Sequence, residues 1–113
     1  MDKLKKYQNA IMDFLTEYQT KMASNPSSDI REQLSFDNER GHYQLLSIGW
    51  QKNNFIFAAI LHFDIIEGKV WIQQNTTEIF VADELMIRGV SKEDIVLGFQ
   101  LPAVRKHTGF ALA

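Results

Sequence analysis

The sequence predicts an α+β protein, with a long N-terminal helix packed on a four-stranded antiparallel meander and short C-terminal helices. The periodicity of apolar residues carries this prediction. They recur at helical spacing as far as residue 22, alternate with polar residues between residues 30 and 74, and then return to helical spacing. Turn-forming residues separate the alternating segments. The 113 residues are 45% hydrophobic and 23% charged, which is typical of one domain spanning residues 1–113.

The first segment is predicted to be an amphipathic helix. Its apolar stripe consists of Leu4, Tyr7, Ile11, Phe14, Leu15, Tyr18 and Met22. Asp2 is the expected N-cap, and turn formers with a proline at residues 24–28 predict a helix end near Ala23. The lysines at its start are expected to be solvated; they are Lys3, Lys5 and Lys6.

Four strands joined by tight turns are expected next. The first contains Ile30, Leu34 and Phe36, and the others are His42–Trp50, Phe55–Ile66 and Lys69–Gln74. The connections are residues 37–41, which end in a glycine, residues 51–54 and residues 67–68. Connections this short favour an antiparallel meander.

The third strand has apolar residues on both faces. Its odd positions are predicted to line the core; they are Phe55, Phe57, Ala59, Leu61, Phe63 and Ile65. Its even positions Ile56, Ala58 and Ile60 are expected on the opposite face, which then needs a second cover. That cover is either the C-terminal helices or a second copy in a homodimer, packed through this face or an exposed strand edge.

The two tryptophans, Trp50 and Trp71, are expected in the core by default. Trp71 is the better candidate for an interface anchor, because its neighbours Val70 and Ile72 take the other face of the strand.

The last third of the chain returns to helix. A helix is predicted over Glu78–Arg88, capped by Thr76 or Thr77 and ended by Gly89. Further on, a helical turn over residues 91–94, a buried run over residues 95–99, a short helix or loop opening at Pro102 and an apolar tail are expected.

Composition excludes several classes of function. The net charge is −2, without the basic surplus that is usual in nucleic-acid-binding domains, and the chain has no cysteine for disulfides, thiolate chemistry or a cysteine zinc site. No signal peptide is evident, and the longest apolar run, Phe55–Leu61, is too short to span a membrane. A cytoplasmic protein without membrane contact is expected.

Catalytic signatures are sparse, so no enzymatic activity and no cofactor or metal is expected. His62 and Asp64 share one strand face, and Glu67 follows in the turn. Such a His–Asp pair is more often a hydrogen-bonded rim than a site. A small hydrolytic or metal-dependent enzyme using these three residues remains an alternative. Asp83 and Glu84 are neighbours on a predicted helix, so their side chains face different directions. This argues against a catalytic site made of paired carboxylates.

Residues 78–94 are acidic and therefore unsuited to reading a DNA groove. The basic residues are the N-terminal lysines Lys3, Lys5 and Lys6 and a cluster with Arg105 and Lys106. If these two groups met in space, they would form a modest patch. A weak DNA-binding accessory role is therefore a second alternative.

An ordered set of residues extends over most of the chain. It comprises residues 42–46, 49–50, 62, 64–65, 68–73, 77–78, 82–85, 89–90, 92–99, 102, 105 and 108–111. This set resembles the XisI-like proteins, the fdxN-element excision controlling factors of cyanobacteria.

The resemblance implies a small cytoplasmic α+β protein that assists programmed excision of a DNA element. A separate recombinase performs the chemistry, and an XisH-like protein is the usual companion. The family provides no catalytic residues to carry over. The leading hypothesis is a non-enzymatic interaction module, expected to be a homodimer, that pairs with an XisH-like partner and contacts DNA only indirectly or weakly.

Overall fold

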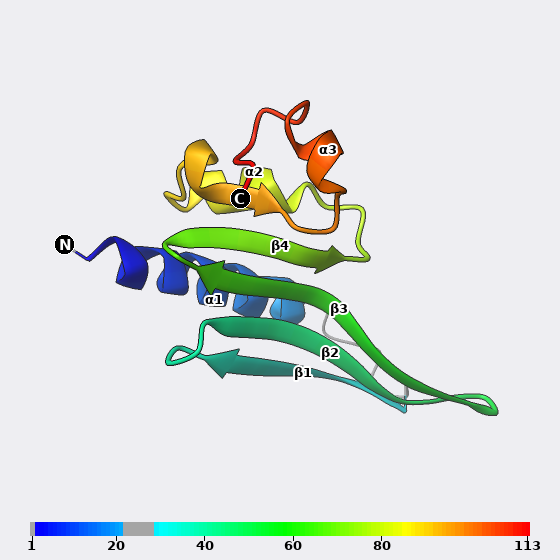
Figure 1. Ribbon diagram of the computed structural model, residues 1–113. Helices are drawn as coiled ribbons and strands as arrows, with labels where there is room; N and C mark the ends of the chain where they lie inside the picture. The colour runs from blue at the N-terminus through cyan, green and yellow to red at the C-terminus, as the bar shows by residue number, and fades with distance from the viewer. Residues whose placement is uncertain (1, 22–28) are drawn as a thin grey trace.

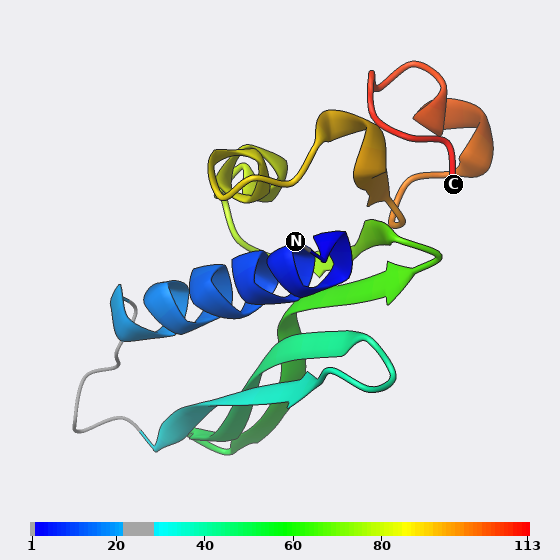
Figure 2. The same ribbon diagram turned by 90° about the vertical axis from the view of Figure 1, so that its left-hand side faces the viewer.

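The computed structural model describes residues 2–21 and 29–113. Within these residues, five strands form one sheet in the order β1-β2-β3-β4-β5, with α1 across one face (Figures 1 and 2). The C-terminal helix α3 and the chain end lie beyond β5, at the far edge of the sheet (Figure 1). The predicted α+β fold is therefore confirmed.

Helix α1 spans Lys3–Lys21 and supplies about a third of the core residues. The predicted N-cap is confirmed, because the Asp2 carboxylate accepts a hydrogen bond of 3.0 Å from the Leu4 amide. Tyr7, Ala10, Ile11, Phe14 and Leu15 are buried against the sheet. The helix end expected near Ala23, with the turn after it, lies outside the described residues.

The four predicted strands form the antiparallel meander. They are β1 (Ile30–Asp37), β2 (His42–Gln51), β3 (Asn54–Ile66) and β4 (Lys69–Asn75). The predicted buried run becomes a fifth strand, β5 (Ile95–Leu97), which pairs in parallel with β4. It is parallel because the chain returns to this edge through a helical crossover.

One β-bulge decides which side chains of β3 face α1. Leu45 pairs with Leu61, whereas the next residue, Leu46, pairs with Ala59, so Ile60 is an extra residue in β3. Paired residues in an antiparallel sheet share a face, and side chains alternate along each strand. After the bulge, the side chains at odd positions of β3, such as Leu61, therefore face α1. Before the bulge, the side chains at odd positions face away from α1.

This bulge overturns two expectations about β3. Phe55 and Phe57 do not line the core, and they are 54% and 66% exposed on the face away from α1. Ile56 and Ala58 do not lie on that second face, because they pair with Gly49 and Ser47 on the α1 side. A single alternation over the whole strand is wrong because an inserted residue reverses its phase.

Short helices complete the C-terminal third. Helix α2 (Val81–Ile87) begins three residues after the predicted start, because the Thr77 hydroxyl accepts the Ile79 amide in a turn ahead of it. It ends at Ile87, and Gly89, the predicted stop, follows its C-cap residue Arg88 with φ of +101°.

The last elements are a 3-10 turn η1 (Lys92–Asp94) and helix α3 (Pro102–Arg105). The tail packs back as expected, with Ala111 bridged to Val96. No helix of the described part of the chain is long and apolar enough to cross a membrane.

Candidate functional site

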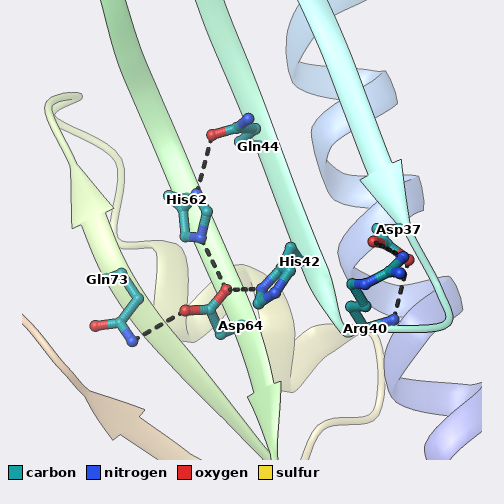
Figure 3. Close-up of polar contacts among 7 residues, drawn as sticks. All are labelled: Asp37, Arg40, His42, Gln44, His62, Asp64 and Gln73. Atoms are coloured by element: carbon teal, nitrogen blue, oxygen red, sulfur yellow. Dashed lines mark hydrogen bonds and ion pairs between the residues drawn. The ribbon is translucent and has the colours of Figure 1, made fainter.

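Three ligand-capable side chains meet on the face of the sheet opposite α1. His62 and Asp64 lie two positions apart on β3, and His42 on β2 is the direct cross-strand partner of Asp64. Asp64 Oδ1 lies 2.8 Å from His42 Nδ1 and 2.8 Å from His62 Nε2 (Figure 3). We call these three residues the histidine–aspartate cluster. One carboxylate oxygen thus bridges two imidazoles from neighbouring strands.

Two glutamines hold the cluster in place. Gln44 Oε1 lies 3.1 Å from His62 Nδ1, and Gln73 Nε2 donates a hydrogen bond of 3.1 Å to Asp64 Oδ2 (Figure 3). The cluster is half-buried, with side-chain exposures of 15% for Asp64, 25% for His62 and 55% for His42. His42 is therefore the member that solvent or another molecule reaches first.

The charge state of Asp64 follows from these contacts. Partial burial raises the pKa of Asp64, but the hydrogen bonds from His42, His62 and Gln73 together lower it by more than that. The net pKa therefore lies below its usual value. The cluster therefore contains a carboxylate that remains ionised at neutral pH.

The structure changes the membership expected from the sequence. His62 and Asp64 are together as predicted, whereas Glu67 lies in the exposed β3–β4 turn, outside the group of ligand atoms that lie within 4.8 Å of one another. His42 takes the third place, and sequence reasoning missed it. No sequence pattern could have placed His42 there, because the register set by the Gln51–Asn54 turn would put it opposite Phe63, and only the bulge at Ile60 moves it opposite Asp64.

Exposed aromatic side chains gather at the far end of the same face. Trp50, Phe55 and Phe57 form this cluster, which we call the aromatic tip. Pairing of β1 with β2 stops at Gly49, so the β2–β3 hairpin projects beyond it, as Figure 1 shows. The Trp50 and Phe55 rings lie 5.2 Å apart. Trp50 is 55% exposed, so its expected core burial is wrong.

Trp71 also lies on this face, while Val70 and Ile72 are buried on the other, as predicted. The Arg105 guanidinium lies 5.0 Å from the Trp71 ring centroid. Arg105 also donates hydrogen bonds to the carbonyls of Leu97, Gly98 and Leu112. Trp71 is thus partly covered from within the chain.

The basic residues do not form one patch. Lys3 pairs with Asp94 at 2.8 Å, and Arg105 is engaged with Trp71 and backbone carbonyls. The start of α1 and helix α3 lie apart in both views (Figures 1 and 2). The arrangement that would favour the DNA-binding alternative is therefore absent from the described residues.

Comparison with known proteins gives one family. The family model described as "XisI protein" matches residues 1–112. A crystal structure of a XisI-like protein from Anabaena variabilis ATCC 29413 is 44% identical, has a TM-score of 0.91, and is matched over 97% of this chain and 99% of that one. The fdxN element excision controlling factor XisI from the same organism is 31% identical, with a TM-score of 0.87 over 99% and 100% of the chains. No curated protein matches the sequence.

Proposed function

The chain belongs to the XisI family, and from this premise we propose that it is a non-enzymatic accessory factor in programmed excision of a DNA element. It acts as a protein-interaction module that binds an XisH-like partner, and it influences DNA through that partner. The fdxN element excision controlling factor that it resembles supports the role in excision. The surface of this chain supports the role in binding.

The observation that carries the binding role is the aromatic tip. Trp50, Phe55 and Phe57 are large apolar side chains more than half exposed on one face of a projecting hairpin. Aromatic residues are over-represented among the residues that contribute most to the binding energy of protein interfaces. Trp50 and Phe55 lie beyond the last β1–β2 pair, and β4 pairs with β3 only from Leu61 onward, so β4 does not pair with β3 beside these three rings.

The test is light scattering after size-exclusion chromatography. The protein, an XisH-like protein and a mixture of the two are run separately, and the mixture is expected to show the mass of a joint complex. Phe57→Ala is expected to weaken the complex at least about thirtyfold, because a hot-spot truncation costs about 2 kcal/mol or more. Phe80→Ala removes an even more exposed ring beside α2 and is expected to leave the complex unchanged.

Two results would overturn the proposal. In the first, the two proteins elute at their separate masses at every concentration tested. In the second, the protein is a dimer by itself, Phe57→Ala makes it monomeric, and the XisH-like protein does not join either form. The aromatic tip would then be an interface between copies of this chain rather than a docking surface for the partner.

A further inference from the structure

We infer that His42, His62 and Asp64 form a binding site for a divalent transition-metal ion, and that Zn²⁺ is the ion this set of ligands favours. The inference goes beyond the proposed function and stands independently of it. It replaces the expectation, drawn from the sequence, that the chain binds no metal. It rests on geometry, on the surrounding hydrogen bonds and on the chemistry of the ligand atoms.

The three ligand atoms already lie at distances suited to a shared ion. His42 Nδ1, His62 Nε2 and Asp64 Oδ1 all lie within 4.8 Å of one another, and both nitrogens are 2.8 Å from the oxygen. In a tetrahedral zinc site with bonds of about 2.0–2.1 Å, ligand atoms are about 3.3 Å apart. To admit the ion, each N–O distance would lengthen by about 0.5 Å and the two nitrogens would lie at a similar separation from each other on this estimate.

The strand backbone holds the ligands in this arrangement. His62 and Asp64 are alternate residues on β3, and His42 is fixed opposite Asp64 by the β2–β3 register. Ligands on paired strands are positioned more firmly than ligands on loops. The three ligands are therefore held close together by the strand backbone without the metal.

The second shell resembles that of known metal sites. Metal-binding histidines usually donate their other ring N–H to an oxygen acceptor, and His62 Nδ1 faces Gln44 Oε1 at 3.1 Å. The other ring nitrogen of His62 faces Asp64 Oδ1. A neutral imidazole has only one N–H, so it cannot donate to both oxygens. A cation between Nε2 and Oδ1 would relieve this conflict and leave the hydrogen bond to Gln44 intact.

The donor types select the class of metal. Two imidazole nitrogens and one carboxylate oxygen suit zinc and neighbouring transition metals, whereas Mg²⁺ and Ca²⁺ prefer sets made of oxygen alone. Three protein ligands leave a coordination position open. Because His42 is the most exposed member, that position faces solvent on the sheet face away from α1.

The test is a Zn²⁺ titration of the full chain without a polyhistidine tag, followed by calorimetry and by competition with a chelating dye. One ion per chain is expected, and excess Mg²⁺ is expected not to compete. His42→Ala and His62→Ala each remove a ligand and are expected to abolish stoichiometric binding. Gln44→Ala removes a second-shell partner and is expected to weaken binding about 10–100-fold.

The matched control is His107→Ala, which removes the exposed histidine near α3 and is expected to leave the affinity unchanged. Circular dichroism of each variant without metal verifies that it is folded. Nuclear magnetic resonance of the imidazole rings provides a second readout, in which zinc is expected on Nδ1 of His42 and Nε2 of His62. Absence of stoichiometric binding, equal binding by folded His62→Ala, or zinc-dependent shifts confined to His107 would each overturn the inference.

Discussion

The Tyr7 hydroxyl donates a hydrogen bond of 2.5 Å to the Asp94 carboxylate, which joins residues 87 positions apart. The same carboxylate pairs with Lys3 Nζ at 2.8 Å, and the Ser91 amide donates to the Tyr7 oxygen. Tyr7 is buried, and an O–H group donating to an ionised carboxylate makes a strong hydrogen bond. This contact fastens the start of α1 to η1, immediately before β5.

The first prediction concerns this contact. Tyr7→Phe is expected to lower the free energy of unfolding by about 1.5–3 kcal/mol, because it removes a hydrogen bond to a charged group. Urea denaturation followed by circular dichroism measures the change. Tyr18→Phe, on the same helix but without a contact to Asp94, is the control. Equal small losses in both variants would show that the Tyr7–Asp94 bond does not stabilise the fold.

The second prediction concerns pH. Partial burial raises the pKa of Asp94, but the hydrogen bonds from Lys3 and Tyr7 together lower it by more than that. The net pKa therefore lies below its ordinary value of 3.8. A carboxyl with a lower pKa in the folded state stabilises the protein fully above its unfolded pKa, and this contribution is lost as pH falls through the folded pKa. The stability difference between wild type and Asp94→Asn is therefore expected to be constant near neutral pH and to shrink below about pH 4. A difference that stays constant in denaturation curves down to the acid limit would contradict this.

The third prediction concerns Gly49. Its φ is +148°, and a Cβ built there would lie 2.1 Å from the Asp29 carbonyl oxygen. Gly68 has φ of +80° but nothing within 4 Å of its Cβ position. Gly68→Ala is therefore expected to cost about 1–2 kcal/mol for backbone strain alone, and Gly49→Ala to cost more because of the added clash. Denaturation midpoints of the two variants compare these costs. An equal loss of stability in both variants would show that the close approach of the Asp29 carbonyl adds no cost.

The fourth prediction concerns the structural role of Arg105. Arg105→Lys keeps the charge but loses the planar group that stacks on Trp71 and contacts three carbonyls. Faster hydrogen exchange at the Gly98 and Ala111 amides is expected, because these amides pair next to the Arg105 contacts. Lys106→Ala changes an exposed neighbour and is the control. Unchanged exchange in Arg105→Lys would show that the guanidinium does not hold the C-terminal segment.

Much of the fold could be predicted because its elements are local. Each of the three later meander strands lies within one residue of its predicted bounds at either end. Periodicity identified them, and glycines with positive φ, such as Gly41 and Gly68, marked the turns between them. The predicted start of α2 was wrong, because the Thr77 hydroxyl accepts a hydrogen bond from the Ile79 amide in a turn that competes with the helix.

The candidate site could be predicted only in part. His62 and Asp64 are two apart on one strand, so their proximity follows from the alternation of side chains. His42 joins them through pairing between strands, which no local pattern reveals. For the same reason Glu67, close in sequence but in the turn, is not part of the cluster.

The sequence alone determined the N-terminal helix, the four strands of the antiparallel meander and their order, since hydrophobic periodicity and turn chemistry act over a few residues. Only the tertiary structure decided which face each side chain of β3 takes, because the single extra residue Ile60 reverses the alternation. That reversal buries Leu61 and Phe63 under α1 and exposes Phe55 and Phe57 at the aromatic tip. The same pairing of β2 with β3 brings His42 to Asp64. Register depends on contacts between distant segments, so both proposed surfaces of this protein emerge only when the strands pair.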